Sequence, residues 1–320
     1  MATPTTDIPH PGSGTRHLSA GIAGASGYAG RELARLIGGH PQLTLRTAQA
    51  RSDGYDALAP IELARCDVAF LCLPHGHSHE FGEAVAHAGT PVVDLGSDFR
   101  LDVGWAYGLT ELFRQDVLGS RQVANPGCYA TAAILALAPL AEAGLLDAPV
   151  AIDGKSGVSG AGREPSESTH VSEVEGGVQP YKPTGHRHIA EIERSLARLA
   201  GEDVPVTFTP HLAPHSRGLE VTCYARLRRP LSQADADAIF HARYDAEPFV
   251  SVEQRVHPGR LHGANSCHVG VWIDERTQTA ICAAAIDNLV KGAAGQALQN
   301  ANLVLGLDEG AGLTPHGLGV

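Results

Sequence analysis

The fold of this chain is decided by Leu18-Ser19-Ala20-Gly21-Ile22-Ala23, which runs directly into Gly24-Ala25-Ser26-Gly27-Tyr28-Ala29-Gly30 and then into Arg31 to Ile37. The first run has the composition of an apolar strand, and the last has that of a helix. A strand, a glycine turn and a helix in this order hold a dinucleotide pyrophosphate against a helix N-terminus. We therefore predict a Rossmann-type unit whose cofactor contacts are Gly24, Ser26, Gly27, Tyr28, Ala29 and Gly30.

The spacing of these glycines, G-x-x-G-x-x-G, is weak evidence by itself, because a chain with 37 glycines produces such a triplet easily by chance. An ordinary glycine-rich turn is the alternative. The position of the triplet, directly after the first strand and before a helix, favours the nucleotide-binding interpretation.

The residues after the second predicted strand, Leu43 to Ala48, indicate which dinucleotide is bound. An NAD-binding unit usually carries Asp or Glu there, to accept hydrogen bonds from the ribose 2′-hydroxyl. This chain has Arg51 and Ser52 instead, which suit the additional 2′-phosphate of NADP. A solvated loop arginine is the alternative, but the sequence favours NADP.

Two further strands, Asp67 to Leu73 and Val92 to Leu95, are nearly all apolar, as strands covered on both faces should be. Strands and helices alternate up to Cys128, which predicts an α/β fold with a doubly wound parallel sheet. Ligands bind such a sheet beyond the carboxyl ends of its strands. Pro74 and Cys128 fall there, as the glycine turn does.

Three histidines, His75, His77 and His79, follow Pro74 on the same turn. A turn does not bring residues at this spacing together as a helix would, and no carboxylate lies within the cluster. We therefore predict that they form a polar rim of the cofactor cleft, and we predict no metal site.

Cys128 is the candidate nucleophile. It lies in Asn125-Pro126-Gly127-Cys128, between a glycine turn and an apolar run that begins at Ala132. A thiol in the first turn of a helix meets unpaired backbone N–H groups and the positive end of the helix dipole, which stabilise the reactive thiolate. A buried structural cysteine is the alternative, and it is the interpretation that suits the other five cysteines of the chain.

Composition narrows the functional classes. A chain of 320 residues suggests two domains, and a net charge of −11 argues against nucleic-acid binding, which needs a basic excess. The six cysteines include no C-x-x-C pair, and no apolar stretch is long enough for a transmembrane helix. Residues 1–16 are polar and are predicted to be a disordered lead-in. We expect a cytoplasmic protein with reduced thiols.

The second half of the chain has a different sequence pattern. Strand-like stretches predominate from Val150 onward, and the last two of these stretches suggest an antiparallel pair of strands. An α+β catalytic domain over residues 128–287 is therefore expected. A helix of small and apolar residues, from Asp287 to about Leu305, is expected to return to the first domain. The nucleotide domain would then comprise residues 17–127 and 288–320.

A base for the thiol is available in Gly185-His186-Arg187-His188-Ile189-Ala190-Glu191. A thiolate–imidazolium pair oriented by a third group is the usual means of activating a cysteine. The alternative is that one or both histidines simply bond the backbone, which is a serious possibility in a chain with 17 histidines.

Taken together, the motifs resemble the N-acetyl-γ-glutamyl-phosphate reductase family of arginine biosynthesis. The resemblance runs from about Leu18 to Leu313 and rests on the glycine turn together with five further motifs. These are Leu73-Pro74-His75-Gly76, Asn125-Pro126-Gly127-Cys128, Lys155-Ser156-Gly157-Val158-Ser159-Gly160-Ala161-Gly162-Arg163, His186-Arg187-His188 and Asp287 to Gln296. The resemblance implies an NADP-dependent homodimer or homotetramer whose catalytic domain is like that of glyceraldehyde-3-phosphate dehydrogenase.

The resemblance also implies a reaction and roles for individual residues. N-acetyl-L-glutamyl 5-phosphate would be reduced to the 5-semialdehyde through a Cys128 thioester, with His186 as acid/base and Glu191 as its orienting partner. His188 is the competing acid/base. Ser156, Gly157 and Asn288 would contact the cofactor. The implied substrate contacts are Arg100, Asn125, Arg163, His188, His211 and Arg217.

Some features leave alternatives open. The chain is shorter than the usual family member between Ser52 and Asp67 and between Leu101 and Tyr107. The stretch Tyr181 to His186 is similar to a lysine-pathway counterpart that acts on a carrier-protein-bound aminoadipyl phosphate. A non-catalytic NADP-binding redox sensor explains the first domain but not Cys128 with its histidines. A cysteine acyltransferase or hydrolase explains Cys128 but leaves the dinucleotide unit without a role.

Overall fold

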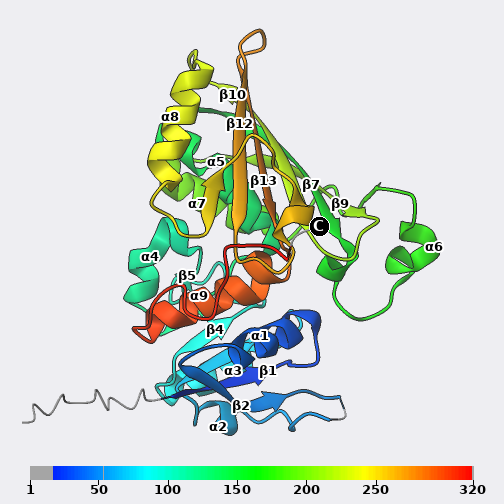
Figure 1. Ribbon diagram of the computed structural model, residues 1–320, viewed down its shortest axis with the longest axis vertical. Helices are drawn as coiled ribbons and strands as arrows, with labels where there is room; N and C mark the ends of the chain where they lie inside the picture. The colour runs from blue at the N-terminus through cyan, green and yellow to red at the C-terminus, as the bar shows by residue number, and fades with distance from the viewer. Residues whose placement is uncertain (1–16, 53, 319–320) are drawn as a thin grey trace, which may run out of the picture.

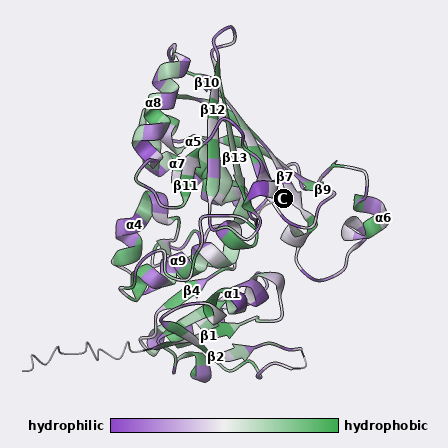
Figure 2. Ribbon diagram, viewed as in Figure 1, coloured by the Kyte–Doolittle hydropathy of each residue, from purple (hydrophilic) through white to green (hydrophobic). Residues whose placement is uncertain are grey.

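The computed structural model describes residues 17–52 and 54–318, so the predicted lead-in over residues 1–16 lies outside the described residues. Within these ranges the chain forms two β-sheets, with helices packed on both (Figure 1). Apolar residues concentrate in the strands and in the central helix α5 (Figure 2). In the same ranges no helix is both long and apolar enough to cross a membrane.

The first sheet is parallel throughout and has the strand order β2-β1-β3-β4-β6-β5. Its strands are β1 (Leu18–Ala23), β2 (Leu43–Gln49), β3 (Val68–Leu71), β4 (Val92–Asp94), β5 (Ala106–Tyr107) and β6 (Gln122–Ala124). The helices that accompany it are α1 (Tyr28–Gly38), α2 (Pro60–Leu63), α3 (Ser78–His87) and α4 (Thr110–Leu118). This is the predicted doubly wound parallel sheet.

The second sheet is mixed, with the order β11-β12-β13-β10-β7-β9-β8. Its strands are β7 (Leu146–Gly157), β8 (Gln179–Pro180), β9 (Val206–Ala213), β10 (Leu219–Leu227), β11 (Val250–Val252), β12 (Cys267–Asp274) and β13 (Thr279–Ile286). The helices of this part are α5 (Cys128–Glu142), α6 (Val171–Val174), α7 (His188–Ala200) and α8 (Gln233–Tyr244), with short 3-10 turns η1 (Val158–Ala161), η2 (Glu167–Thr169) and η3 (Pro258–Leu261). The predicted late antiparallel pair is β12 and β13.

Helix α5 carries Cys128 as its first residue and is buried from Tyr129 to Ala141. A helix that is apolar on all sides belongs in a core. Here α5 lies between the second sheet and α7, in a core cluster that includes Val221 of β10 and Ile192 of α7. Cys128 is therefore fixed at one end of the most deeply buried helix of the catalytic domain.

The helical segment after β13 returns to the first sheet, whereas Thr314 and Leu318 bond Asn265 and His262 of the second half of the chain, at 2.8 and 2.9 Å. A π-helical turn, η4 (Val290–Ala294), leads into α9 (Gly295–Val304). Ala297, Leu298 and Ala301 of α9 pack in the core cluster of Ala20 and Phe70. Small side chains permit this close approach of helix and sheet.

A buried ion pair also anchors this segment. The ammonium group of Lys291, in η4, is fully buried and bonds the carboxylate of Glu111 in α4. The amide oxygen of Gln299 accepts a second hydrogen bond from the same ammonium at 2.8 Å. Burial alone would raise the pKa of Glu111, but the Lys291 charge and the hydrogen bonds that Glu111 accepts together outweigh burial, and the net pKa is lowered. The pair therefore ties η4 to α4.

Candidate active site

Cys128 follows β6 through the turn Asn125-Pro126-Gly127, at the carboxyl edge of the parallel sheet. Gly127 is the N-cap of α5, with φ −73° and ψ 150°. A Cβ atom on Gly127 would lie 2.3 Å from Nε2 of His188 and 2.6 Å from Nη1 of Arg100. Only glycine therefore permits these two side chains to approach the turn before the nucleophile. The predicted position of Cys128 at a helix start is confirmed.

The electrostatic surroundings of Cys128 differ from the expectation. Burial of the thiol group raises the pKa of Cys128 above its ordinary value, and the nearby Glu191 carboxylate adds to this. The charges of Arg100 and Arg187 and the backbone N–H of Tyr129 lower the pKa, but they do not outweigh burial. The thiol is therefore mainly protonated at neutral pH, and its attack on an electrophile needs a group that takes the proton.

The two predicted histidines lie against each other. Their ring centroids are 4.6 Å apart and the rings are nearly perpendicular. Nδ1 of His186 accepts the backbone N–H of His188 at 3.2 Å. Burial, with Arg187 and Lys182, lowers the pKa of His186 to about 4. His186 is therefore neutral, and its proton is on Nε2, because Nδ1 is an acceptor.

His188 begins helix α7 and is 4% exposed. Burial lowers its pKa well below the ordinary value, and Arg100 adds to the effect. Its Nε2 lies 3.8 Å from Oε1 of Glu191, and its Nδ1 is a buried atom with no hydrogen-bond partner among the described residues. This imidazole faces the turn that carries Cys128 and has an unused nitrogen.

Glu191 lies with Arg100 and His188, and not with His186 as the sequence predicted. Its Oε1 accepts from Nη1 of Arg100 at 2.8 Å, and its Oε2 accepts from the Tyr107 hydroxyl at 2.7 Å. The backbone N–H of Gly127 also donates to Oε2, at 3.1 Å. The physical reason is the helix period: Glu191 is three residues after His188, so both project from the same face of α7.

Arg100 and Asn125 were predicted to bind substrate, and both are engaged within the protein. Arg100 is 7% exposed and donates from Nε to the Asn125 carbonyl at 3.0 Å and from Nη2 to the Leu95 carbonyl at 3.2 Å. The Asn125 side chain is 1% exposed and bonds Asn300 of α9 at 3.0 Å and the Ala293 carbonyl at 3.2 Å. These contacts join the nucleophile turn to the last helix and to α7.

Arg217 and His211 lie on strands or loops of the second sheet. Arg217 bonds Asp287 at 2.7 Å and Glu32 of α1 at 3.1 Å, so its guanidinium bridges the two halves of the molecule. His211 lies 3.5 Å from Asp153 and bonds the Gly154 carbonyl at 3.2 Å. The two carboxylates around Arg217 neutralise the charge that was expected to bind the substrate.

The glycine turn has the shape that a dinucleotide requires. Gly24 has φ +83°, and a Cβ there would lie 2.1 Å from the carbonyl oxygen of Cys72. A Cβ on Gly30 would lie 2.4 Å from the carbonyl oxygen of Gly24. Gly27 caps α1, and Tyr28 and Ala29 form its first turn. The N–H of Gly27 donates to the Gly24 carbonyl at 3.2 Å, and the N–H groups of the first turn of α1 have no acceptor inside the helix, which fits a pyrophosphate.

Arg163 was predicted to bind substrate, and the structure places it beside the glycine turn instead. Its guanidinium donates to the carbonyl oxygen of Ser26 at 3.3 Å from an exposed position. Arg51 and Ser52 follow β2 at the same edge of the sheet, with Arg51 exposed.

Ser156, Gly157 and Asn288 come together near the end of β7. The Asn288 amide bonds the N–H of Gly218 at 2.7 Å and the Ser159 hydroxyl at 2.9 Å. A Cβ on Gly160 would lie 2.8 Å from the Ser156 hydroxyl oxygen and 3.8 Å from the Asn288 amide nitrogen. The three predicted cofactor residues therefore share one small region, although the Asn288 amide is largely engaged.

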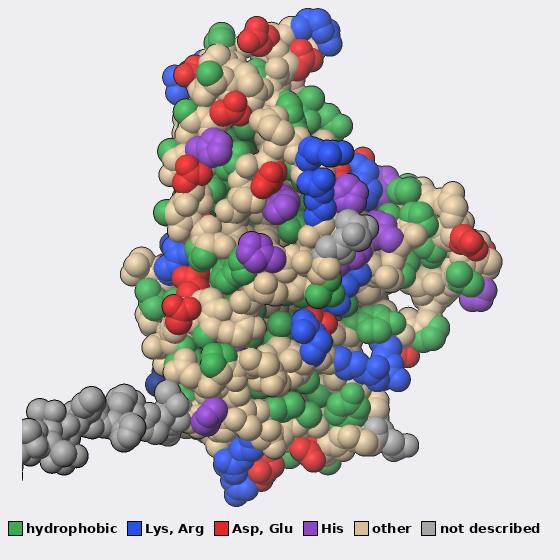
Figure 3. All heavy atoms as spheres, in the orientation of Figure 1, with side chains coloured by type: hydrophobic (Ala, Val, Ile, Leu, Met, Phe, Trp, Pro, Cys, Tyr) green, Lys and Arg blue, Asp and Glu red, His purple; other side chains and the backbone are tan. Residues whose placement is uncertain are grey.

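Pro74, His75 and His77 lie at the turn after β3, whereas His79, predicted on the same turn, lies in the first turn of α3; all four are exposed. His75 Nδ1 lies 2.7 Å from Oδ1 of Asp98, which also accepts from the N–H of Gly76 at 2.9 Å. Over the described residues no group of three His, Cys, Asp or Glu side chains has a geometry that could hold a metal. Histidines and basic side chains gather across the middle of the face drawn in Figure 3.

Sequence reasoning missed two tyrosines. Tyr107 bonds Glu191, and Tyr181 lies 5.8 Å from His186, measured between ring centroids. Burial raises the pKa of Tyr181 to about 12, and the Cys128 charge adds to this. Tyr181 lies in the stretch that resembled the lysine branch, so a signal existed for it. Tyr107 has no local signal, because its partner is 84 residues away.

The comparisons with known proteins agree with this geometry. Residues 19–120 match the model of the semialdehyde dehydrogenase NAD binding domain, and residues 128–288 match that of the semialdehyde dehydrogenase dimerisation domain. The N-acetyl-gamma-glutamyl-phosphate reductase of Moorella thermoacetica is 40% identical over 94% of this chain and 99% of its own length. The protein of the same name from Halorhodospira halophila is 42% identical over 92% and 98%. The chain belongs to the N-acetyl-γ-glutamyl-phosphate reductase family.

A solved relative confirms the fold class. Aspartate semialdehyde dehydrogenase II from Vibrio cholerae has a TM-score of 0.73 and 18% identity, over 91% of this chain and 99% of its own. Family membership makes the protein an oxidoreductase with an NAD(P)-binding domain. The predicted family, fold class and enzyme class are thereby confirmed.

Proposed function

We propose that the protein reduces N-acetyl-L-glutamyl 5-phosphate to N-acetyl-L-glutamate 5-semialdehyde and phosphate, with NADPH as the reductant. The observation that carries the proposal is Cys128, the first residue of α5, which follows a turn beside His188 and Arg100, in a family member matched over 94% of its length. Similarity to named reductases over 92–94% of the chain favours this interpretation over the lysine-pathway counterpart and over a redox sensor.

Cys128 performs the first step. Its sulfur attacks the acyl carbon, a C–S bond forms, and the C–O bond to phosphate breaks with the electron pair leaving on phosphate. The product is a thioester on Cys128, which splits a difficult reduction into two easier steps. The nicotinamide, when bound, supplies the hydride that reduces the thioester carbon. Collapse of the hemithioacetal then breaks the C–S bond and returns the proton to the thiol.

The histidine contacts suggest how protons move. We propose His188 as the group that takes the thiol proton, because it lies beside the Cys128 turn, its Nδ1 has no partner, and Glu191 faces its Nε2. The low pKa of neutral His188 is compatible with this role only if the thiolate and imidazolium form together as substrate binds. His186 carries its proton on Nε2 and is suited to donate a hydrogen bond to the substrate. The family resemblance implied His186 as the acid/base, with His188 as the competing choice.

The residues around the glycine turn fit a dinucleotide, and we propose NADP. Arg51 and Ser52 would bind the 2′-phosphate, and Gly24, Ser26, Gly27, Tyr28, Ala29 and Gly30 the pyrophosphate. Pro74, Ser156, Gly157 and Asn288 would line the nicotinamide half. Arg163, beside Ser26, is placed to neutralise a cofactor phosphate rather than a substrate group.

We propose that residues 17–127 and 288–320 bind the cofactor, and that residues 128–287 carry catalysis and oligomer contacts. A cytoplasmic homodimer or homotetramer is what the family resemblance implies, and the match to a dimerisation domain supports the oligomer. Among the predicted substrate residues, His211 remains a direct contact in this proposal. Arg100, Asn125 and Arg217 act by positioning, because their polar atoms are held by protein partners.

One assay tests the function. Reduction of NADP by N-acetylglutamate semialdehyde is measured with and without inorganic phosphate, beside carrier-bound aminoadipate semialdehyde. We expect strictly phosphate-dependent activity with the acetylated substrate, and no activity in Cys128→Ser, although this variant still binds NADP. A preference for the carrier-bound substrate would identify the lysine-pathway reaction. Activity of more than a few per cent in Cys128→Ser would remove the thiol as nucleophile.

A further inference from the structure

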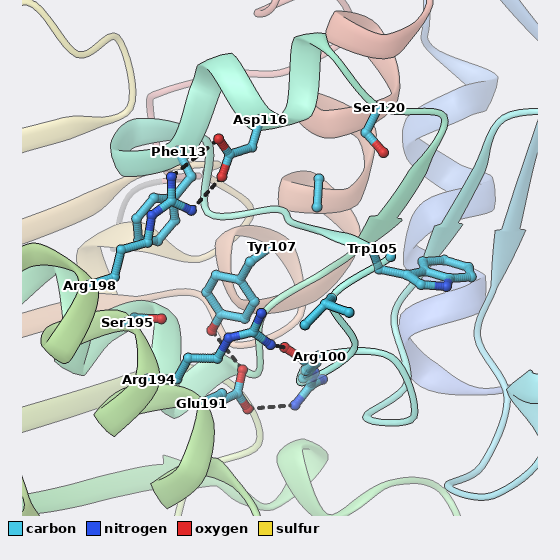
Figure 4. Close-up of a pocket in the computed structure, with 13 residues that line it drawn as sticks. Arg100, Trp105, Tyr107, Phe113, Asp116, Ser120, Glu191, Arg194, Ser195 and Arg198 are labelled. Carbon is cyan, nitrogen blue, oxygen red and sulfur yellow. Dashed lines mark hydrogen bonds and ion pairs between the residues drawn. The ribbon is translucent and has the colours of Figure 1, made fainter. Parts of the chain in front are cut away.

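A cavity of about 390 Å³ lies behind the catalytic network, between α4, the β5 strand and α7 (Figure 4). Arg100 and Glu191 form a wall that it shares with the catalytic site. The residues that line the cavity do not include Cys128, His186 or His188. Its other walls are Trp105, Tyr107, Phe113, Arg194 and Arg198, with smaller contributions from neighbouring residues.

The charges of the cavity are almost balanced, but one cation is left over. Arg100 is paired with Glu191, and Arg198 is paired with Asp116 and lies over the Phe113 ring at 4.4 Å. Arg194 is exposed, and its hydrogen bond at 3.2 Å goes to the carbonyl oxygen of Arg100. Arg194 thus brings a positive charge into the cavity without a carboxylate partner among the lining residues. Figure 4 shows this side chain reaching over Glu191 toward Tyr107.

We propose that this cavity binds a small organic monocarboxylic acid, whose carboxylate pairs with Arg194, and that the bound acid reduces the reactivity of Cys128. One uncompensated charge fits a single carboxylate, which guanidinium binds through two parallel hydrogen bonds. The carboxylates of Asp116 and Glu191 repel a doubly charged phosphate. Trp105, Tyr107 and Phe113 provide the apolar contact that an organic body needs, and the volume is that of a small-ligand site.

Arg100 connects the cavity electrostatically to the Cys128 thiol. Arg100 is the charge that most favours the Cys128 thiolate, and its Nη1 approaches the Gly127 turn. A carboxylate held by Arg194 lies in the cavity that Arg100 also lines. Its negative charge opposes that of Arg100, so the thiol becomes harder to ionise. Tyr107 and Glu191 connect the cavity to the Gly127 N–H through two hydrogen bonds.

Trp105 provides a direct readout of binding. The chain has two tryptophans, Trp105 in the cavity wall and Trp272 on β12, so Trp272→Phe leaves the fluorescence of Trp105 alone. Benzoate is titrated into this variant at constant ionic strength, beside neutral benzamide and inorganic phosphate. We expect saturable quenching by benzoate in the millimolar range, and weaker or no effects of the two controls. Quenching by benzamide or phosphate equal to that by benzoate would overturn the proposed ligand class.

Two variants locate the site. Arg194→Met should weaken benzoate binding about tenfold or more, which is the usual effect of losing a charge-assisted hydrogen bond. Arg194→Lys should retain part of the affinity. The matched control is Arg65→Met, which removes an exposed arginine that follows α2 and does not line the cavity. Absence of binding in the parent, or equal affinity in the parent and Arg194→Met, would overturn the site.

Coupling to Cys128 is measured by its alkylation with iodoacetamide, which does not depend on the proposed substrate or cofactor. Saturating benzoate should slow alkylation several-fold in the parent and not in Arg194→Met. Without benzoate, Arg65→Met should alkylate at the parent rate, whereas Arg194→Met should alkylate more slowly than the parent, because it lacks the positive charge that the bound carboxylate neutralises. An alkylation rate that does not change when benzoate is bound would overturn the proposed effect on Cys128.

Discussion

Arg100→Lys separates a positioning role of Arg100 from a substrate-binding role. Lysine keeps the positive charge and can still reach Glu191, but it lacks the fork that reaches the Asn125 and Leu95 carbonyls at 3.0 and 3.2 Å. Each of the two carbonyls that loses its donor inside the protein costs about 1–3 kcal/mol, so the free energy of unfolding should fall by about 2–6 kcal/mol. For a chain of this size the melting temperature should fall by roughly 3–9 °C.

The assay combines thermal unfolding with steady-state kinetics. The matched control is Arg163→Lys, an exposed arginine with a single bond at 3.3 Å, which should melt within about 1 °C of the parent. Arg100→Met adds loss of charge, so it should also move the pH profile of Cys128 alkylation to higher pH, because Arg100 lowers the pKa of that thiol. If Arg100→Lys melts like the parent while KM for the acyl phosphate rises tenfold or more, Arg100 contacts the substrate and our reasoning is wrong.

Three further predictions concern the cofactor, the base and the buried ion pair. Arg51→Asp should weaken NADP far more than NAD in equilibrium binding, and equal effects would show that Arg51 does not read the 2′-phosphate. His188→Asn should lower kcat by roughly two to four orders of magnitude with little change in melting, and a larger loss in His186→Asn would reverse the two roles. Lys291→Met should cost about 3–5 kcal/mol near neutral pH, because it leaves the Glu111 carboxylate buried and unpaired. In the parent the pKa of Glu111 is lowered, so its contribution to stability is present above the unfolded pKa and is lost as the pH falls through the folded value. In Lys291→Met, Glu111 protonates more readily, so the difference in melting temperature should be smaller at pH 5 than at pH 7.5; an equal difference would contradict the pairing.

Local patterns were sufficient for the parts of the fold that depend on near neighbours. Strand β1 runs from Leu18 to Ala23, as predicted, because its apolar run stops at the glycine turn. The start of α5 at Cys128 followed from Pro126 and Gly127. The short edge strands β5, β8 and β11 carry no such signal, since two or three residues show no periodicity. The π-helical turn at Lys291 was also missed, because its shape depends on the buried partner Glu111.

The residue roles were harder to predict, because they depend on partners that are far away in the sequence. Arg100 pairs with Glu191, 91 residues later, and Arg217 pairs with Asp287 and Glu32. An arginine in a motif suggests that its side chain pairs with an anion. The motif does not indicate whether that anion is a ligand or a carboxylate of the same chain. Spacing did place Glu191 and His188 on one helix face, and this could have been used to prefer His188.

These four arginines therefore fall into two groups, according to how many of their N–H groups already donate to other residues of the chain. Arg100 and Arg217 are held by two or more protein partners, so an incoming anion would have to displace a buried carboxylate or carbonyl, at a cost that a surface arginine does not face. Arg163 and Arg194 each give one hydrogen bond to a backbone carbonyl from an exposed position. Their charges remain available. One lies beside the glycine turn and the other in the cavity behind Glu191, so anion binding is expected at these two positions, while the charges nearest Cys128 set the reactivity of the thiol.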